Sequence, residues 1–385
     1  MNGFGLDGPD TARRNSAKED CGDTSRRRVL AVRLDGLGDV LLTGPALRAL
    51  AAKTAHLTLL AGPGGAGAAE LLPGVNDVMT YQAPWIGPDP RPLDHGSMRF
   101  LMRELLLGDF DEAVVFTSLH QSPLPMALLL RMSAVPRISA ISVDDPGTLL
   151  DVRHLVDEDV PESERALSLV RAAGFDLPPG DDGRLALRGP LPDVSGLVPQ
   201  GEYVVVHPGC SAPARTWSAE RWAQAVQALA AEGHRVVVTG SESERALTGK
   251  VAAVSPAGAA LDLGGRTGMR ELAAVLAGAA VTVAPNTGPA HLSAACGTPV
   301  VSLFAPVVPA ARWAPYGVPT VLLGDQDAPC AGSRARECPV PGHPCLNTVA
   351  AHDVVAAVGK LLAETGTRRG HRGCDHAQGG GEVSA

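Results

Sequence analysis

Lysine is almost absent from this 385-residue sequence, so arginine carries nearly all of its positive charge. The lysines are Lys18, Lys53, Lys250 and Lys360. Acidic residues outnumber Lys and Arg by 41 to 33, which gives a net charge of −8 at pH 7. Because a protein that binds nucleic acid over an extended surface needs a basic face, this composition argues against nucleic acid as a partner.

Long apolar runs are also missing. No segment reaches the roughly 18 apolar residues that a membrane-spanning helix requires. The first 25 or so residues are polar and lack the apolar centre of a secretory signal peptide. We therefore expect a cytoplasmic protein, whose contact with the inner face of the plasma membrane, if it makes any, is peripheral. We expect disorder in residues 1–25 and in the Gly-, Arg- and His-rich tail, residues 365–385.

The cysteines lack the CxxC spacing of most structural zinc sites. They are Cys21, Cys210, Cys296, Cys330, Cys338, Cys345 and Cys374. An odd number, spread over a long chain with no export signal, indicates reduced thiols. Three of them cluster between residues 330 and 345, and with His343 they offer four ligands to zinc. We favour a loop braced by proline and glycine there and expect no metal.

Strands and helices alternate through the first half of the chain. The length favours two or three domains. The predicted strands are 28–33, 56–61, 77–81, 112–116 and 137–141. Helices are expected at 41–52, shortly before Leu72, at 97–107 and at 122–132. This alternation is typical of a mostly parallel, doubly wound sheet.

A segment rich in proline, glycine and aspartate, residues 177–201, then interrupts the pattern, and we expect it to link two domains, 26–190 and 191–364. The pattern restarts after it. The second set of predicted strands is 203–206, 235–239, 261–263, 281–283 and 300–304, with helices at 218–231, 242–253, 268–276 and from about 290. We predict an α/β fold of two doubly wound Rossmann-like domains that face each other across a cleft, with ligands bound outside the carboxyl ends of the strands.

The segment 280–306 reads as strand, tight loop, helix and strand. Its loop enters the amino end of a helix, where unpaired N–H groups and the helix dipole favour an anion. Thr287 adds a hydroxyl, Gly288 allows close approach, and His291 lies one turn into the helix, so a diphosphate suits this loop. The alternative is that Asn286 only caps the helix and His291 is a half-buried histidine with its hydrogen bonds satisfied.

The loop RLDGLGDV follows the first strand and carries Asp35 and Asp39. It is not GxGxxG, and the second strand ends without the acidic residue that a nicotinamide ribose wants, which disfavours a dinucleotide oxidoreductase. Asp39 lies where the loop enters a helix and can take a proton from an attacking hydroxyl. It can equally be an N-cap or first-turn carboxylate.

Three further loops carry polar side chains at strand ends. Arg215 can hold phosphate oxygens with its planar guanidinium, or be an exposed surface charge. Glu244 can accept hydrogen bonds from ribose hydroxyls, or favour a helix amino end. His120 and Gln121 can contact acceptor hydroxyls, or satisfy one another. Scattered arginines, namely Arg48, Arg131 and Arg137, can meet an anionic lipid-linked acceptor or be solvated surface.

Taken together and in order, RLDGLGDV, HPGCSAPARTW, TGSESE, PNTGPAHLSAACGTPVVSLFAP and the Cys-containing loop resemble glycosyltransferase family 9, the ADP-heptose:lipopolysaccharide heptosyltransferases. The resemblance extends over residues 29–362. It implies the two-domain GT-B fold and an inverting, metal-independent transfer from a nucleotide-sugar donor to a glycan or glycolipid acceptor. It implies no cofactor, and we expect a monomer.

The resemblance also implies roles for single residues. Asp39 takes the place of the catalytic base, Arg215 contacts the donor diphosphate, and Glu244 holds the donor ribose. Thr287, Gly288 and His291 cradle the diphosphate and sugar. The other donor-binding candidates are Gly38, His207, Pro208, Gly209, Ser211, Trp217, Gly240, Asn286 and Pro289, and the acceptor-binding candidates are Arg33, His120 and Gln121.

Two positions depart from the family pattern. Asn286 stands where an aspartate is usual, which removes a charge near the sugar hydroxyls and leaves the sugar open. Ser333 stands where some members have a further cysteine. Two other functions remain open: a catalytically silent nucleotide-sugar-binding protein, motivated by Asn286, and a GT-B-like nucleotide-sugar epimerase.

Overall fold

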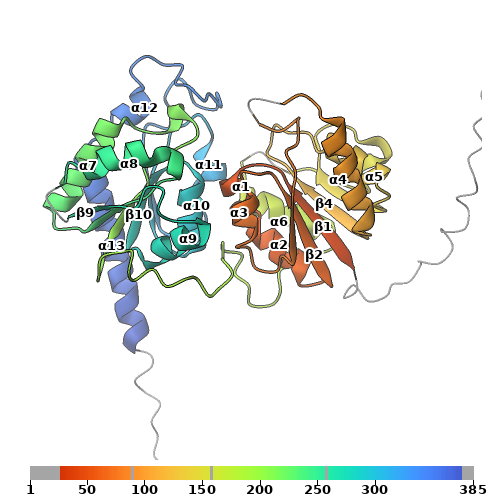
Figure 1. Cartoon of the computed structure of the whole chain (residues 1–385), viewed down its shortest axis with the longest axis horizontal. Coiled ribbons are helices and arrows are strands. Elements are labelled where there is room, and N and C mark those ends of the chain that lie inside the picture. Colours follow the sequence, from red (N-terminus) through yellow and green to blue (C-terminus); the bar gives the residue numbers. More distant parts are fainter. Residues whose placement is uncertain (1–26, 88–90, 157–158, 256–258, 375–385) are drawn as a thin grey trace, which may run out of the picture.

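The computed structural model describes residues 27–87, 91–156, 159–255 and 259–374. Two six-stranded parallel sheets, each covered by helices, lie side by side (Figure 1). We call the half built from β1–β6 the N-lobe and the half built from β7–β12 the C-lobe. The residues for which disorder is expected at the amino terminus, 1–25, lie outside the described residues.

The N-lobe sheet has the strand order β3-β2-β1-β4-β5-β6. Its strands are β1 (Arg28–Arg33), β2 (His56–Ala61), β3 (Asp77–Thr80), β4 (Glu112–Phe116), β5 (Arg137–Ile141) and β6 (Val152–His154). Its helices are α1 (Leu37–Leu42), α2 (Gly44–Ala51), α3 (Ala66–Ala69), α4 (His95–Leu107), α5 (Leu124–Met132) and α6 (Glu162–Ala172), and a 3-10 turn, η2, covers Gly147–Leu149. β1 is an apolar run because a central parallel strand is covered on both faces.

The C-lobe repeats this design with the order β12-β11-β10-β7-β8-β9. Its strands are β7 (Val204–Val206), β8 (Val236–Val238), β9 (Ala260–Asp262), β10 (Val281–Pro285), β11 (Val300–Leu303) and β12 (Thr320–Leu323). Its helices are α7 (Ala219–Ala231), α8 (Arg245–Ala252), α9 (Met269–Gly278), α10 (Gly288–Ala295), α11 (Ala310–Trp313), α12 (Pro344–Asn347) and α13 (Ala351–Cys374), with 3-10 turns η3 (Pro213–Arg215) and η4 (Glu242–Glu244). All strand pairs within each sheet are parallel, as the alternation predicted.

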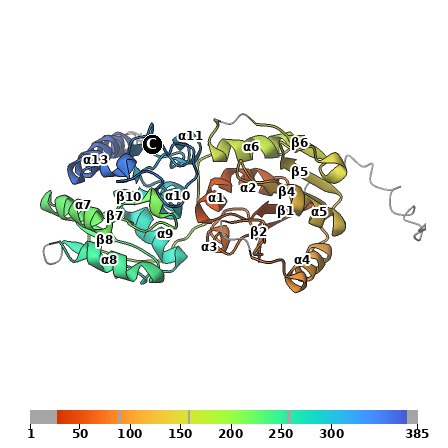
Figure 2. The same ribbon diagram turned by 90° about the horizontal axis from the view of Figure 1, so that it is seen from above.

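The strand order of each sheet reverses beside one strand pair, β1/β4 in the N-lobe and β7/β10 in the C-lobe. Such a reversal opens a crevice at the carboxyl ends of the two strands, because their connections leave in opposite directions. The two crevices face each other, and α1 and α10 are in contact where the lobes meet, as the view from above shows (Figure 2). The loops after these four strands are those in which the sequence placed most of its candidates.

The structure differs from the sequence-based prediction at several elements. The helix expected over 41–52 is two helices, because α1 ends at Leu42 and α2 begins at Gly44, with Thr43 between them and Pro45 in the first turn of α2. The prediction missed several elements altogether, among them β6, α6, β12 and α13. The tail from Thr365 was expected to be disordered, yet α13 continues to Cys374; residues 375–385 lie outside the described part of the chain.

The connection between α6 and β7 contains no helix or strand and lies against both lobes. From the N-lobe, Arg48 binds it through an ion pair of 2.6 Å between its Nε and Oδ2 of Asp181. From the C-lobe, Arg270 donates a hydrogen bond of 2.7 Å to the carbonyl oxygen of Pro190. Across the described residues, none of the helices is both long and apolar enough to cross a membrane.

Candidate active site

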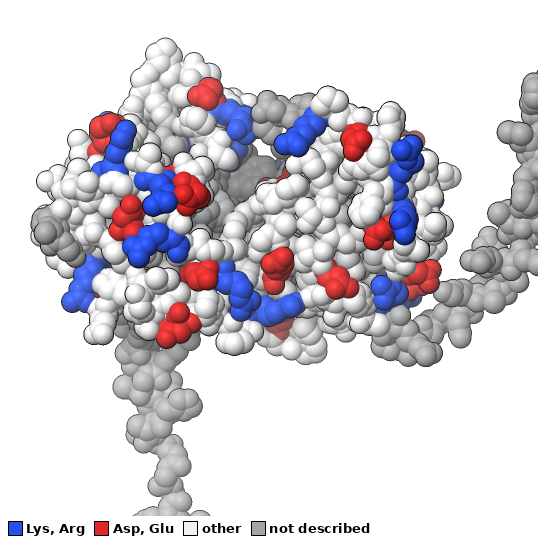
Figure 3. All heavy atoms as spheres, viewed as in Figure 1, with Lys and Arg blue, Asp and Glu red and all other residues white. Residues whose placement is uncertain are grey.

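A cavity of about 1050 Å³ lies between the lobes, at the carboxyl ends of the strands that flank the two crevices. Figure 3 shows the hollow between the two halves, with basic side chains on its rim. Its walls come from both lobes, with Asp39 on one side and Arg215 on the other. Most of the sequence candidates line it: Gly38, Asp39, His120, Gln121, His207, Ser211, Arg215, Gly240, Glu244, Asn286, Thr287, Gly288, Pro289 and His291.

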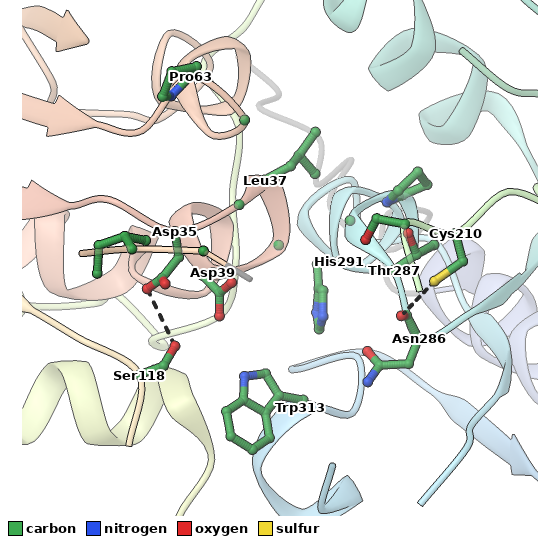
Figure 4. Close-up of a pocket in the computed structure, with 18 of the residues that line it drawn as sticks. Asp35, Leu37, Asp39, Pro63, Ser118, Cys210, Asn286, Thr287, His291 and Trp313 are labelled. Atoms are coloured by element: carbon green, nitrogen blue, oxygen red, sulfur yellow. Dashed lines mark hydrogen bonds between the residues drawn. The ribbon is translucent and has the colours of Figure 1, made fainter. Parts of the chain in front are cut away.

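Asp39 lies in the first turn of α1, where its carboxylate is one-quarter exposed to the cavity. The N-cap of α1 is Gly36, so Asp39 does not cap the helix, although a first-turn carboxylate is favoured by the helix dipole. Its Oδ1 accepts a hydrogen bond of 3.0 Å from Nη2 of Arg33. Figure 4 shows Asp39 and His291 on opposite sides of the same space.

Arg33 does not line the cavity, which corrects its assignment to acceptor contact. Only 2% of the residue is exposed, and it lies behind the carboxylates of Asp35 and Asp39. Burial alone lowers the pKa of Arg33, but Asp35, Asp39 and Glu162 outweigh burial and leave the pKa above its ordinary value. Arg33 is therefore a permanent cation that orients Asp39 from the side away from the cavity.

Gln121 and His120 do not bond to each other. Nε2 of Gln121 donates to Oδ1 of Asp35, and its Oε1 accepts the backbone N–H of Ser118 at 3.1 Å. Ser118 in turn donates through its hydroxyl to Oδ2 of Asp35 at 3.4 Å (Figure 4). Burial raises the pKa of Asp35 even though Arg33 lies beside it. Gln121 thus ties the loop after β4 to the loop after β1 and leaves His120 facing the cavity.

Arg215 ends the short turn η3 and faces the cavity from the C-lobe. Its Nε is buried and has no hydrogen-bond partner. Its guanidinium forms neither a side-chain hydrogen bond nor an ion pair with the rest of the described chain, so it is available to an anion in the cavity. Because a guanidinium binds phosphate oxygens through a planar pair of N–H groups, a diphosphate suits this position.

The loop after β10 brings α10 to the cavity with Thr287, not Asn286, as its N-cap and with no side-chain cap hydrogen bond. His291, one turn into α10, is 3% exposed and its Nδ1 has no hydrogen-bond partner. The alternative interpretation is therefore wrong in both parts: Asn286 does not cap the helix, and the hydrogen bonds of His291 are not all made. Burial, followed by the charge of Arg215, lowers the pKa of His291 to about 4, so its imidazole is neutral at pH 7.

Glu244 caps its own helix while facing the cavity. Its Oε2 accepts the backbone N–H of Ser241 at 2.7 Å and the hydroxyl of Ser241 at 2.8 Å, which closes a capping box. Gly209 does not line the cavity but makes room for this carboxylate, because a Cβ there would lie 2.0 Å from Oε1 of Glu244. Burial lowers the pKa of the neighbouring His207 to about 4, although Glu244 opposes the shift.

Trp217 and Pro208 also lie outside the cavity wall. Trp217 is 4% exposed and packs edge-on against Trp222, with ring centres 5.3 Å apart. Its Nε1 donates a 2.8 Å hydrogen bond to the carbonyl oxygen of Leu346, so it fastens α12 to the C-lobe core instead of contacting a donor. The carbonyl oxygen of Pro208 accepts the hydroxyl of Thr216 at 2.8 Å.

The family model for glycosyltransferase family 9 (heptosyltransferase) matches residues 98–343. The chain belongs to glycosyltransferase family 9. It is therefore a glycosyltransferase of the heptosyltransferase family, as its loops indicated. No protein of curated function matches it by sequence.

Solved structures share the GT-B fold of this family 9 chain. Escherichia coli ADP-heptose LPS heptosyltransferase II superposes with a TM-score of 0.67 and 19% identity, over 88% of this chain and 99% of the other. The family 9 glycosyltransferase of Veillonella parvula gives 0.71 and 17%, over 89% and 99%. E. coli heptosyltransferase WaaC with ADP gives 0.64 and 19%, over 87% and 99%.

The Cys-containing loop of this glycosyltransferase is anchored in the C-lobe core. Cys330 is 2% exposed and Cys345 is fully buried, and Nε2 of His343 lies 3.1 Å from the carbonyl oxygen of Ala214. Within the described ranges, no group of three or more His, Cys, Asp or Glu side chains is arranged to hold a metal ion. Burial, together with the nearby thiols of Cys330 and Cys338, raises the pKa of Cys345 to about 11.

Reasoning from sequence missed several residues of the family 9 cavity. The Cys-containing loop presents Arg334 and Arg336, and α11 presents Trp313. Arg334 acts across the cavity: burial and then its charge lower the pKa of His120. For Trp313 the sequence did hold a signal, because tryptophan is rare in this chain, with four in all, and Trp313 follows a predicted strand. Arg48, Arg131 and Arg137 line no part of the cavity, because each pairs with a carboxylate elsewhere in the N-lobe or its linker.

Proposed function

We propose that this family 9 enzyme transfers a sugar, heptose, from ADP-heptose to a hydroxyl of a glycan or glycolipid acceptor, with inversion and without a metal ion. The observation that carries the proposal is one cavity with opposed chemistry on its two walls. The N-lobe contributes the carboxylate of Asp39, held by Arg33, and the C-lobe contributes the unpaired guanidinium of Arg215 beside the start of α10. We accordingly assign residues 26–190 to the acceptor and 191–364 to the donor.

The reaction is a single in-line displacement. Asp39 takes the proton of the acceptor hydroxyl, whose oxygen attacks the anomeric carbon, and the bond from that carbon to the phosphate oxygen breaks. The nucleoside diphosphate leaves with the electron pair of that bond, so negative charge grows on its terminal phosphate. One displacement on the face opposite the leaving group inverts the anomeric carbon.

The C-lobe meets the growing charge with groups already in place. Arg215 supplies a cation, and the backbone N–H of Gly288 and the dipole of α10 favour an anion at the helix start. His291 is neutral, so it can donate a hydrogen bond from Nδ1 without adding a second positive charge beside Arg215. Fixed donors aimed at developing charge are commonly the largest electrostatic contribution to catalysis.

The choice of ADP as the nucleotide of the donor is supported by one similar structure, E. coli heptosyltransferase WaaC with ADP. Heptose is supported by family membership. Sugar transfer, as opposed to donor binding alone, is supported by Asp39, because a protein that only binds the donor needs no carboxylate opposite Arg215.

The test begins with a thermal-shift screen of the purified chain against ADP, GDP and UDP sugars, since a ligand that binds only the folded state raises its melting temperature. The donor that binds is then incubated with candidate acceptors, and release of nucleoside diphosphate is measured. We expect release that depends on the acceptor and is lost in Asp39→Asn. Binding with no release for any acceptor favours the silent binder, and conversion of the donor sugar with no acceptor present favours the epimerase.

A further inference from the structure

A buried cluster of charged side chains lies directly behind Asp39 and joins the two lobes. Its members are Arg33, Asp35, Asp39, Glu162, Arg165 and Arg312. All of them belong to the N-lobe except Arg312, which the C-lobe contributes from α11. Glu162 begins α6 and is 3% exposed, and Arg312 is 2% exposed. Neither residue lines the cavity, so both act on the reaction only through others.

Glu162 lies close to three arginines without a hydrogen bond to any of them. Its Oε1 is 3.7 Å from Nη1 of Arg312, and its Oε2 is 3.8 Å from Nη2 of Arg33 and 3.9 Å from Nη1 of Arg165. Among the described residues, both oxygens of Glu162 and both terminal nitrogens of Arg312 lack any hydrogen-bond partner. Buried charges are costly unless they are paired and hydrogen-bonded.

The separation of Arg312 and Glu162 is only slightly longer than a charge-assisted hydrogen bond. Such bonds have N–O distances near 2.8 Å, so a relative movement of the lobes by about 1 Å would form one between Arg312 and Glu162. The movement would satisfy two buried groups that lack partners. An approach of the lobes at α6 and α11 would therefore be favourable.

Charge balance points the same way. With Arg312 in place the cluster holds three arginines and three carboxylates. Without Arg312 the N-lobe alone holds two arginines, Arg33 and Arg165, against the three carboxylates. Arg33 must then serve Glu162 as well as Asp39, and the orientation of Asp39 is less well determined. The C-lobe thus supplies the charge that completes the surroundings of the proposed base.

The same short helix reaches the cavity. Trp313 follows Arg312 and lines the cavity, where Figure 4 shows it between the residues of the two lobes. The guanidinium carbon of Arg312 lies 5.8 Å from the centre of the Trp313 ring. Just beyond α11, the hydroxyl of Tyr316 donates to Oε1 of Glu164 in α6. A ligand that packs against Trp313 therefore acts on the segment that carries Arg312 to α6.

We propose that Glu162 and Arg312 form an interdomain latch that engages when the lobes close on the donor and holds Asp39 opposite it. Both are positioning residues. The proposal rests on the proposed function, because the role of Asp39 as base belongs to it. Closure is a property of the protein itself and is measured without turnover.

The test is a double-mutant cycle with Glu162→Gln and Arg312→Met. Each single change unbalances the buried cluster, so we expect each to lower the melting temperature. The double variant keeps Arg33 and Arg165 against Asp35 and Asp39, and we expect it to melt above at least one of the single variants. A double variant whose loss equals the sum of the two single losses would show that the pair is not coupled, and would overturn the latch.

The second measurement separates a latch from a purely structural ion pair. Small-angle X-ray scattering with saturating nucleoside diphosphate should show compaction of the wild type but not of the stable double variant. Release of nucleoside diphosphate from the donor should stay on the order of 10-fold below wild type in that variant, because Asp39 is no longer held in place. Wild-type compaction and turnover in the double variant would overturn the proposal. A matched control, Arg131→Met with Asp151→Asn, removes an ion pair within the N-lobe, away from the lobe contact, and should leave compaction and turnover unchanged.

The two proposals fail in different ways. If the wild type binds none of the nucleotides and releases no product, the proposed function fails, while the melting-temperature cycle still decides whether Glu162 and Arg312 are coupled. If the wild type transfers sugar but the double variant does so equally well, the function stands and the latch fails.

Discussion

Gly38 and His291 meet across the lobes so closely that a Cβ atom on residue 38 would lie 2.7 Å from Cδ2 of His291. The reciprocal contact is as tight, because a Cβ on Gly288 would lie 2.5 Å from Cδ2 of Leu37. α1 and α10 can therefore meet only through glycines. This contact sets how near Asp39 comes to the groups at the start of α10.

We expect Gly38→Ala to push the lobes apart and to lower turnover on the order of 10- to 100-fold, because misplacing a catalytic group by about 1 Å costs that much. Alanine is favoured over glycine inside a helix by about 1 kcal/mol, so α1 itself should not be weakened. Steady-state kinetics and a melting curve check this. Gly359→Ala is the matched control, since Gly359 lies in α13 away from the cavity and a Cβ there has no atom within 4 Å. Equal activity of the two variants would contradict the role of the contact.

Asp39→Asn should lower turnover on the order of 100-fold or more, because the amide cannot take the proton of an acceptor hydroxyl. The amide oxygen can still accept the hydrogen bond from Arg33, so the fold should persist. The measurement is the transfer rate with the true acceptor, beside a melting curve as the control. Normal turnover of this variant would remove Asp39 from the role of base.

The sequence predicted the strands well because central parallel strands are apolar runs with polar ends. β1, β2, β4 and β5 have the predicted bounds. The gathering of the loops also followed from the sequence, since the carboxyl ends of parallel strands meet at one edge. What those loops contact across the cleft did not follow, because it depends on how two independent sheets face each other.

The helix α6 escaped prediction because its buried face carries charges. α6 has the sequence ESERALSLVRA, and its charged residues Glu162 and Arg165 are buried, so its core-facing side does not read as apolar. Trp217 failed in the opposite way: its place in a site loop suggested ligand contact, but its ring lies in the C-lobe core. Arg334 and Arg336 reach the cavity only because a long irregular loop folds back over η3, where the N–H of Ala214 donates to the carbonyl oxygen of Arg336. No periodic pattern reports such a path.

Arg215→Ala should lower turnover on the order of 100-fold or more, because it removes a preorganised cation from the leaving phosphate. The melting temperature should not fall, since this guanidinium has no hydrogen bond or ion pair within the described chain to lose. Donor titration and transfer kinetics measure the effect, with Arg215→Lys as the variant that retains charge. A stable protein with full activity after Arg215→Ala would contradict the assignment, and a large loss of stability would show a structural role instead.

Stability should fall as the pH drops from about 6.5 to about 4, in part because His291 is buried as the neutral form. Its pKa is about 4 in the folded protein and near 6.5 when unfolded, so the unfolded chain binds more protons between these values. The resulting loss is on the order of 3 kcal/mol across that window. His207, whose pKa is also lowered to about 4, adds a loss of the same sign. Burial raises the pKa values of Asp35 and Glu162, so these carboxyl groups act in the opposite direction.

The contribution of His291 is isolated by comparing the wild type with His291→Gln in urea unfolding at several pH values. Both proteins share the carboxyl groups and His207, so their difference in unfolding free energy reports residue 291. We expect the advantage of the wild type over the variant to shrink steadily from pH 6.5 to pH 4 and to be constant above pH 7.5. A difference that does not change with pH would mean that His291 is not buried as a neutral imidazole, and the hydrogen bond proposed for its Nδ1 would lose its basis.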